Sequence, residues 1–593
     1  MENVESKVKL RSIFARLLKY TKGHGSTYAL ALVFVGINVA VDLFIPFATG
    51  YSLKLLGEDP IDIKNFLLFN ALAILAIIIM AFSQYMQTYL LNKNGNRIVF
   101  NIRNEVLSHI QKLSHNQFHN IPTGKLVTRV TSDINVIYEF FTNILVSLLK
   151  NVFTLVGVFI AMALLNIKLT LILLIVTPVL TAFAIIFSKV SRKVHRKVRD
   201  NVSQMNAFLS ENISGIKVTQ VFGQESKIYR EFEDNNNKLK KSILKEIFVF
   251  GIFRPSIFLL YVLSIVIVVW FGGNEAINVN LGILSVGITY DLLFTFYQYI
   301  AKFFNPIQIL ADQFNELQSS IASAEKIFTV LDMVPEIVDS EDAIEMEIKG
   351  DIEFKNVWFA YIPGDWILKD VSFHIKAGST AAFVGATGAG KTTALALITR
   401  NYDVTKGQIL IDGVDIRHIK LDCLRSQIGQ MLQDVFLFSG TINSNITLNE
   451  DVDEAEVKRC SEYVNASKFI EKLPDGYETL VRERGENFSL GQRQLISFAR
   501  TIITKPNIMI LDEATSNIDT ETELLIQDSL TRILKLGTVV IVAHRLSTIQ
   551  HCDKIFVFDR GTIIESGNHQ ELLANHGRYY SLYQLQFSQK IGE

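Results

Sequence analysis

Cysteine is scarce in this chain, and the few cysteines present are not spaced for metal or disulfide chemistry. Only three occur, Cys423, Cys460 and Cys552, all in the C-terminal part and none in a Cys-x-x-Cys pair. This scarcity argues against a disulfide framework or a zinc site and predicts three buried apolar thiols. The chain also lacks an excess of charge of either sign. Its net charge is -1, so no general basic surface indicates a nucleic-acid partner.

Apolar side chains, in contrast, are in excess. Hydrophobic residues make up 49% of the 593 residues, and the mean hydropathy is +0.27. Nearly all of the excess lies before about residue 306, while the remainder has the composition of a cytosolic α/β domain. A chain of this length is too long for one hydrophobic core, so we expect at least two domains.

Six apolar stretches are each close to the ~20 residues that a helix needs to cross ~30 Å of hydrocarbon. They lie at about 27–50, 66–91, 139–165, 168–188, 248–271 and 282–305. The first 25 residues are basic but lack the short apolar core and cleavage site of a signal peptide, which predicts a retained cytoplasmic elbow. The loop after the first span is acidic, and those after the second and fourth are rich in Lys and Arg. Because positive loops stay inside, we expect both chain ends in the cytosol and a lipid bilayer around the spans.

The two inner connections are about 45 and 60 residues long and continue the helical periodicity of the spans beside them. This pattern predicts that the second to fifth helices extend far into the cytosol. At the tips of these extensions, 117–124 and 213–222 are expected to dock on the second domain. The alternative for both segments is a solvated loop.

Ionisable groups inside the spans are costly in lipid and are expected to face protein or water. Asp42 lies in the first span with Asn38 one helical turn earlier on the same face, and Asp291 lies in the sixth. Counting from the outer ends places both carboxylates at similar depth, where together they would line a cavity that attracts cationic amphiphiles. The alternative is that each is neutral or hydrogen-bonded between helices. Lys150 and Asn151 in the third span either provide a counter-charge or face a hydrated gap.

The clearest chemical signal is a glycine-rich loop between a strand and a helix. The buried strand TAAFV at 380–384 leads into GATGAGKT at 385–392, a complete P-loop. Its backbone N–H groups surround phosphate oxygens, Lys391 neutralises the β and γ charges, and the Thr392 hydroxyl reaches Mg²⁺. ATP and Mg²⁺ are therefore the predicted ligands. The residues expected to hold the nucleotide on this side are Gly385, Thr387, Gly388, Gly390, Lys391, Thr392 and Thr393.

The second signal is an apolar strand that ends in two acids, IMILDE at 508–513. The end of the strand delivers Asp512 to the water shell of the metal, and Glu513 directly after it can polarise an attacking water. A structural cap is the alternative for two such acids. That alternative is weak beside an intact P-loop.

With these motifs the chain resembles the ATP-binding cassette (ABC) family over essentially its whole length. FSLGQ at 488–492 is similar to the family signature LSGGQ. The resemblance assigns Tyr361 to stacking on adenine, Gln433 to Mg²⁺ and to sensing the membrane domain, and His544 to the γ-phosphate. It assigns SNID at 516–519 to a loop that crosses to another subunit. The remaining residues that it implies near nucleotide are Ser489, Gly491, Gln492 and Asp519.

Six spans followed by a cassette resemble exporters, and most of all bacterial multidrug half-transporters. The implied fold is a multidomain membrane protein, with a six-helix all-α transmembrane domain followed by an α/β P-loop nucleotide-binding domain. The expected boundaries are 1–25 for the elbow, 26–320 for the transmembrane domain, 321–350 for a linker and 351–593 for the cassette. The implied activity is transport-coupled ATP hydrolysis in a bacterial plasma membrane. Its catalytic residues would be Gln433, Glu513 and His544, and its metal-binding residues Thr392, Gln433 and Asp512.

The resemblance also implies a partner, because two cassettes of this family enclose two ATP molecules head to tail. Leu490 stands where the signature has its first glycine, and Arg482 where the family commonly has another. A branched side chain at 490 would hinder close approach of backbone to phosphate. We therefore interpret the chain as one subunit of a heterodimer, with a homodimer that tolerates Leu490 as the alternative.

The predicted function is export of small amphipathic, cationic drugs by alternating access. A lipid flippase would use the same cavity for headgroups and is the alternative within transport. A regulatory module in which nucleotide gates another protein is the alternative outside it. That module would have no need of Lys391, Glu513 and His544 together.

Overall fold

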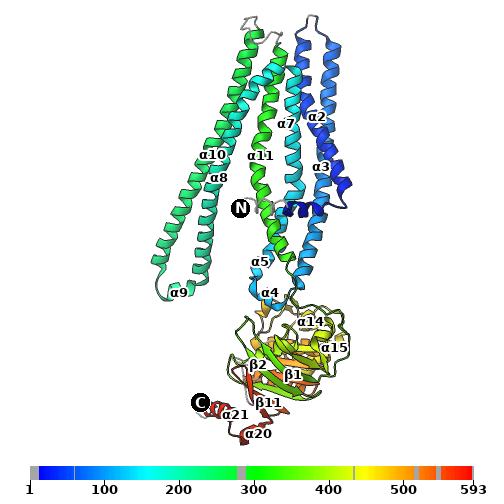
Figure 1. Ribbon diagram of the computed structural model, residues 1–593, viewed down its shortest axis with the longest axis vertical. Helices are drawn as coiled ribbons and strands as arrows, with labels where there is room; N and C mark the ends of the chain where they lie inside the picture. Colours follow the sequence, from blue (N-terminus) through cyan, green and yellow to red (C-terminus); the bar gives the residue numbers. More distant parts are fainter. Residues whose placement is uncertain are drawn as a thin grey trace. The chain divides into compact units, whose positions relative to one another are not determined.

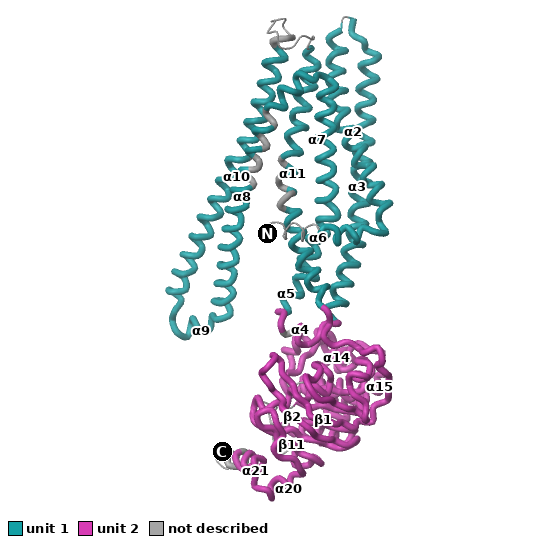
Figure 2. Tube along the Cα trace, in the orientation of Figure 1, with its two compact units in different colours: residues 1–111, 123–333 teal, residues 112–122, 334–593 magenta. Residues whose placement is uncertain are grey.

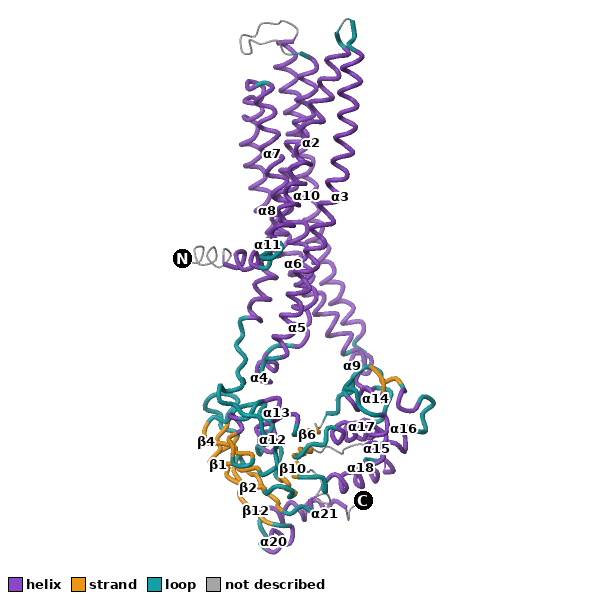
Figure 3. The backbone as a smooth tube through the Cα atoms, turned by 90° about the vertical axis from the view of Figure 1, so that its right-hand side faces the viewer, coloured by secondary structure: helices purple, strands orange, loops and turns teal. Residues whose placement is uncertain are grey.

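The computed structural model describes residues 12–58, 60–276, 289–431, 434–512, 520–542 and 549–590. The chain divides into two compact units, which Figure 2 colours separately. Unit 1 comprises residues 1–111 and 123–333, and unit 2 comprises residues 112–122 and 334–593. All strands in the described ranges belong to unit 2 (Figure 3).

Unit 1 is built from long helices that lie alongside one another (Figure 1). They are α2 (Gly25–Leu56), α3 (Ile63–Gln111), α7 (Leu145–Leu165), α8 (Ile167–Ser214), α10 (Glu225–Ala276) and α11 (Tyr290–Leu331). Shorter pieces connect them: α5 (Thr123–Thr128), η1 (Arg129–Asp133), α6 (Ile134–Glu139) and η2 (Phe140–Ile144) before α7, and α9 (Ile216–Val221) between α8 and α10. Among the described residues, four continuous helices are long and apolar enough to cross a membrane: α2, α3, 123–165 and α10.

The first three predicted spans and the fifth fall on these four helices, and the fourth falls on α8. The sixth begins outside the described residues and continues into α11. The predicted cytosolic extensions are confirmed as helix. α8 has 48 residues and α10 has 52, whereas ~20 residues suffice to cross a bilayer. The described part of the elbow is helical over 12–19. It is fixed to α11 by an ion pair of 2.7 Å between Arg16 and Asp332.

Unit 2 contains a six-stranded sheet in the order β12-β11-β3-β10-β9-β6 and a four-stranded antiparallel sheet in the order β2-β1-β4-β5. In the larger sheet all strands are parallel except β12. The strands of this unit are β1 (Ile352–Phe359), β2 (Leu368–Ile375), β3 (Thr380–Val384), β4 (Lys406–Ile411), β5 (Val414–Asp415), β6 (Ile428–Met431), β7 (Gly440–Thr441), β8 (Leu480–Val481), β9 (Ile508–Asp512), β10 (Thr538–Val542), β11 (Lys554–Asp559) and β12 (Thr562–Gly567). Its helices are α4 (His115–Asn120), α12 (Lys391–Ile398), η3 (Ile416–His418), α13 (Leu421–Ser426), α14 (Ile442–Thr447), α15 (Glu454–Tyr463), α16 (Ser467–Ile470), η4 (Gly476–Glu478), η5 (Glu483–Gly485), α17 (Leu490–Ile503), α18 (Thr520–Ile533), α20 (His569–Ala574) and α21 (Arg578–Lys590).

The large sheet is covered on both faces, which explains why its central strands are apolar throughout. Along β3, Ala382 and Val384 join one core cluster with α17 and α18, while Ala381 and Phe383 join another with α12 and the small sheet. All five residues of β3, β9 and β10 are buried. The strands predicted at 380–384 and 508–512 are therefore confirmed.

Two predictions are wrong in part. The linker was predicted to begin at 321, but α11 continues to Leu331 because Ala324, Ile327 and Phe328 keep the helical spacing of buried residues. Cys460 and Cys552 are buried as predicted, and all three cysteines are free, but Cys423 is only half-buried. Its thiol donates to the Met346 carbonyl at 3.2 Å.

Candidate functional site

The glycine-rich loop lies between β3 and α12, as the sequence predicts. Gly390 precedes the helix with φ of 104°, in the left-handed region that favours glycine. A Cβ there would lie 2.6 Å from Cδ2 of Leu368, so the loop has no space for a side chain at this point. Residues 386–388 are exposed, and the loop is therefore open to a ligand at the start of α12.

Lys391 is held by this loop. Only 6% of the residue is exposed, and its Nζ donates to the carbonyls of Gly385 at 2.8 Å and Ala386 at 2.9 Å. Burial lowers the pKa of Lys391, and the carboxylate of Asp512 opposes that shift. The ammonium group is thus fixed beside the loop, where it can neutralise phosphate charge.

The carboxyl ends of three parallel strands meet next to the loop. Val542 at the end of β10 is in register with Phe383 of β3 on one side and with Asp512 of β9 on the other. Ligands of open α/β sheets bind at this edge. Four predicted residues lie outside the described ranges: Gln433, Glu513, Asp519 and His544. Glu513 follows the end of β9 directly in the sequence, and His544 is two residues beyond the end of β10.

The described donors fit a magnesium ion. Thr392 is exposed in the first turn of α12, and Asp512 is buried at the end of β9. A hydroxyl and a carboxylate are the hard oxygen ligands that Mg²⁺ prefers, and the ion keeps its other positions for water and phosphate. Within the described residues no group of three or more His, Cys, Asp or Glu could hold a metal.

Tyr361 forms one wall beside α12. Its hydroxyl lies 3.1 Å from Oγ1 of Thr393, and its ring packs edge-on against Phe359 and Tyr402 with centroids 4.8 and 5.1 Å apart. The residue remains 43% exposed, so the fixed ring is accessible to a base. Thr393 is buried, and its hydroxyl holds the Tyr361 ring in place.

The FSLGQ motif forms the start of a helix. Ser489 caps α17, and its hydroxyl accepts from the N–H of Gln492 at 3.2 Å, while Oε1 of Gln492 accepts from the N–H of Ser489 at 2.9 Å. Leu490 is the first helical residue and is half-buried, and Gly491 is buried. The motif thus has the geometry of a helix N-terminus, with a branched side chain at its first position.

Two family models match this sequence. The ABC transporter transmembrane region matches residues 28–307, and the ABC transporter model matches residues 368–516. An ATP-dependent lipid A-core flippase of Syntrophus aciditrophicus is 37% identical over 585 residues, which are 98% of this chain and 96% of the relative. The chain belongs to the ABC transporter family.

Further comparisons place this ABC transporter among the exporters. A relative in Bacillus subtilis, named a probable multidrug resistance ABC transporter ATP-binding/permease protein, is 38% identical over 538 residues, 89% of this chain and 78% of the relative. A bacterial Atm1-family ABC exporter solved with ATP bound is similar with a TM-score of 0.78 and 26% identity, covering 95% of this chain and 98% of the other. The predicted fold is thereby confirmed, and the cassette of this ABC exporter is an ATP-binding domain of a multi-pass membrane protein.

The first predicted docking segment of the ABC exporter belongs to unit 2, together with the cassette. Ser114 caps α4 and donates to Oε2 of Glu336 at 2.9 Å, and Nε2 of Gln117 donates to the Val334 carbonyl at 2.8 Å. His115 packs edge-on against Tyr402 with centroids 5.8 Å apart. Docking is therefore confirmed for this segment, although the contacts begin at Ser114 rather than at 117. Sequence reasoning missed Tyr402, which touches both α4 and the ring of Tyr361.

In unit 1, Asp42 has a counterion that the sequence reading did not identify. Nζ of Lys302 on α11 donates to Oδ1 of Asp42 on α2 at 2.9 Å, and the two side chains are 28% and 24% exposed. Asn38 is buried and donates to Oε1 of Gln87 at 2.8 Å. The polar groups of α2 are thus bonded between helices.

The expectation that Asp42 and Asp291 lie at similar depth is wrong. α11 begins at Tyr290, so Asp291 lies in its first turn, where the helix dipole favours a carboxylate. Asp291 lies next to Gly50, because a Cβ on Gly50 would be 3.2 Å from the Asp291 carbonyl oxygen, and Gly50 is eight residues further along α2 than Asp42. Eight residues are about 12 Å along a helix. The span was predicted to start at 282, which placed Asp291 too deep.

Proposed function

We propose that this ABC exporter hydrolyses ATP to expel amphipathic, cationic drugs or other xenobiotics across a bacterial plasma membrane by alternating access. The observation that carries the ATP-driven part is the common edge where the P-loop, Lys391 and Asp512 meet at the ends of parallel strands. Thr392 and Asp512 would hold Mg²⁺, which would neutralise phosphate charge there. Glu513 polarises the attacking water, and His544 contacts the γ-phosphate.

Closure of two cassettes around ATP would drive the membrane helices through their docking segments. The contacts of α4 with Glu336 and Tyr402 support this coupling, because they connect a segment between two predicted spans to residues next to Tyr361. The helical extensions then tilt as rigid levers. ATP's preference for the closed pair supplies the shift from an inward-facing to an outward-facing state.

The second half of this transporter is, in our proposal, a different chain. A helix N-terminus such as that of α17 can close on phosphate only from across a cassette interface, and Leu490 crowds the position of closest approach. The tip around α9 also needs a protein contact, because its apolar side chains are solvent-exposed: Val218 is 61% exposed, Val221 80% and Phe222 70%. A homodimer is the alternative.

Changing Leu490→Gly tests this assignment. In the chain purified alone we expect the substitution to raise ATP hydrolysis about tenfold, because removing the side chain lets backbone N–H groups approach the phosphate. Leu421→Gly is a matched control, since Leu421 is also a half-buried first residue of a helix. Steady-state hydrolysis is measured with and without a co-expressed half that carries an intact LSGGQ. Full turnover by the wild-type chain alone contradicts the heterodimer.

For the substrate, we propose that a cationic group competes with Lys302 for Asp42. An ion pair within the membrane is expensive unless both charges are satisfied, and because this pair is about a quarter exposed, an incoming cation could reach Asp42 and replace Lys302. Asp291, at the outer end of α11, would then meet the substrate late on its path, with Asn38 beside Asp42 in the first span.

Charge variants of this pair give opposite predictions. In liposomes, Asp42→Asn should reduce export of a cationic dye roughly five- to tenfold, because it removes the anion and leaves Lys302 unpaired. Lys302→Gln should increase cation export relative to a neutral dye of similar size, and the double variant should show no charge preference. ATP binding in the same preparations controls for damage. Unchanged cation export in Asp42→Asn would remove Asp42 from the pathway.

A lipid flippase is the second candidate, favoured by the similarity to the lipid A-core flippase. Stimulation of ATP hydrolysis by lipid rather than by drugs would select it. In either case we propose that the N- and C-termini are cytoplasmic, with 1–25 as the elbow, 26–320 as the membrane domain and 351–593 as the cassette. The basic loops after the second and fourth spans support this orientation.

A further inference from the structure

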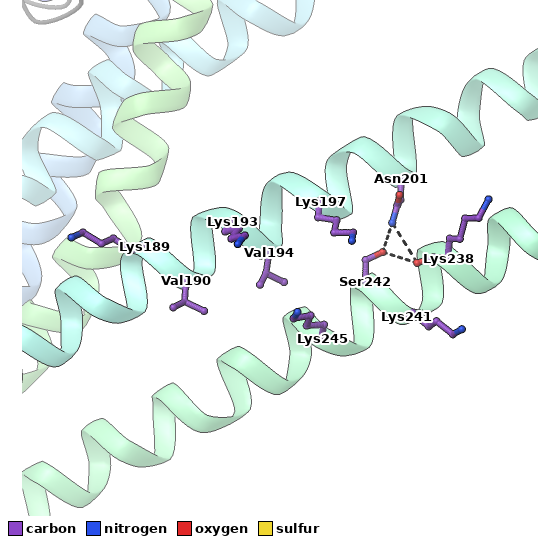
Figure 4. Close-up of a pocket in the computed structure, with 10 residues that line it drawn as sticks. All are labelled: Lys189, Val190, Lys193, Val194, Lys197, Asn201, Lys238, Lys241, Ser242 and Lys245. Atoms are coloured by element: carbon purple, nitrogen blue, oxygen red, sulfur yellow. Dashed lines mark hydrogen bonds between the residues drawn. The ribbon is translucent and has the colours of Figure 1, made fainter. Parts of the chain in front are cut away.

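The paired helices α8 and α10 enclose a strongly basic groove of about 990 Å³. Figure 4 shows its residues on the two facing helices. We call it the lysine groove, after the six lysines that line it: Lys189, Lys193, Lys197, Lys238, Lys241 and Lys245. None of the proposed steps of nucleotide use or drug export involves it.

Charge is segregated onto these two helices. Residues 189–204 contain six Lys or Arg and one acid, and residues 238–246 contain four Lys and one acid. The second acid, Glu246, is bonded to His195 at 2.6 Å. Within the described residues none of the six lysines of the groove forms an ion pair. Such a concentration of like charge, in a chain whose net charge is -1, would be stabilised by a bound anion.

The groove begins where the fourth and fifth predicted spans end, at residues 188 and 248. Phe187 of α8 packs on Phe250 of α10 with ring centroids 5.3 Å apart. Lys193 lies six residues beyond Phe187, and Lys245 five residues before Phe250. By helix rise both are about 8 to 9 Å from this aromatic layer. A headgroup layer is roughly 5 to 8 Å deep, so these two ammonium groups can reach lipid phosphates.

The remaining lining suits an amphiphile. Val190 and Val194 point from α8 towards α10 between the lysines (Figure 4). At the far end, Nδ2 of Asn201 on α8 donates to Oγ of Ser242 on α10 at 2.6 Å, and this hydrogen bond joins the two helices. The groove is therefore lined by valines between the two helices and by lysines around them. The hydrogen bond between Asn201 and Ser242 lies at the end farther from Phe187 and Phe250.

We propose that the lysine groove binds the phosphate group of an anionic phospholipid from the inner leaflet, with Lys193 and Lys245 as the principal contacts. Lysine clusters directly cytoplasmic of membrane helices recognise anionic headgroups in this way. The bound phosphate bridges α8 and α10 and relieves the repulsion between their lysines. A phosphate from a soluble compound has the same chemistry but would not need the position at the membrane boundary.

The test uses the full chain, in the assembly in which it purifies, reconstituted in nanodiscs of phosphatidylcholine with increasing phosphatidylglycerol. Native mass spectrometry counts retained phosphatidylglycerol, and thermal unfolding reports stabilisation. Lys193→Gln combined with Lys245→Gln should weaken phosphatidylglycerol retention at least tenfold. The matched control is Lys227→Gln with Arg230→Gln, which removes the same charge from α10 about 30 Å beyond Phe250 and should retain the lipid.

Three outcomes overturn the proposal. Equal retention of phosphatidylglycerol by both double variants excludes Lys193 and Lys245 as contacts. Displacement of the lipid by glycerol phosphate at equal concentration identifies a site for soluble anions. Loss of assembly in the Lys193/Lys245 variant, without a change in lipid retention, identifies the groove as a contact between subunits. ATP hydrolysis in pure phosphatidylcholine reports separately on the nucleotide site.

Discussion

Replacing Glu513 by glutamine should stop ATP hydrolysis and leave ATP binding nearly intact. Glutamine has the size of glutamate but cannot accept a proton from the attacking water, and loss of a general base typically costs about 10²–10⁴-fold in rate. The residue follows Asp512 at the edge where Lys391 lies. Binding of a fluorescent nucleotide and release of phosphate, measured on the same preparation, separate the two effects.

Glu521→Gln is the control for this variant. Glu521 is exposed in the first turn of α18, and its substitution removes the same charge from the same domain. It should hydrolyse ATP at the wild-type rate. Hydrolysis that persists in Glu513→Gln would show that another group activates the water, and the assigned role would be wrong.

In Lys391→Gln, unlike in Glu513→Gln, ATP binding itself should weaken. This change removes the one ammonium group fixed by the carbonyls of Gly385 and Ala386, and with it a charge-assisted bond to phosphate. We expect ATP affinity to fall about 10- to 100-fold, and hydrolysis to fall with it. Isothermal titration compares the affinity for ATP with the affinity for adenosine. Adenosine is expected to stack on Tyr361 without needing Lys391, so its affinity should change little.

Lys376→Gln provides the matched control, since Lys376 is an exposed lysine of the same unit. Wild-type ATP affinity in Lys391→Gln would contradict the nucleotide assignment of the P-loop itself. An equal loss of adenosine binding would instead indicate that the substitution disrupts the fold of the loop. Thermal unfolding of the purified variant distinguishes that result from loss of a ligand contact.

Lys391 is expected to act in ATP binding and Glu513 in hydrolysis, and both expectations depend on strands of the same sheet. β3 supplies the loop before Lys391, β9 supplies Asp512, and the register of β10 with both strands aligns their ends. A shift of one residue in that pairing would exchange the side chains that a strand presents to the two core clusters. The packing on the two core clusters therefore fixes the site as well as the fold.

The P-loop, the acidic strand and the long helical extensions could be predicted because each depends on residues close together in the sequence. Glycine at 390 is required by local backbone geometry, and apolar runs at 380–384 and 508–512 indicate buried strands wherever they occur. The length of α8 and α10 likewise follows from a periodicity that continues past the apolar stretch.

Other features depend on residues that are distant in sequence. The ion pair between Asp42 and Lys302 joins positions 260 residues apart, and Tyr402 contacts both α4 and Tyr361. The depth of Asp291 depends on where α11 begins, which the apolar run from 282 did not mark. The lysine groove likewise could not be predicted from the sequence, because its lining comes from both α8 and α10.

The sequence by itself therefore determined the local features of this exporter: a glycine-rich loop before a helix, a buried strand that ends in Asp512, and helices longer than a bilayer crossing needs. Only the tertiary structure decided which charges neutralise one another and which remain available for ligands. The physical reason is that helix length and strand burial are summed over neighbouring residues, whereas the state of a charge is set by whatever the fold brings within a few ångströms of it.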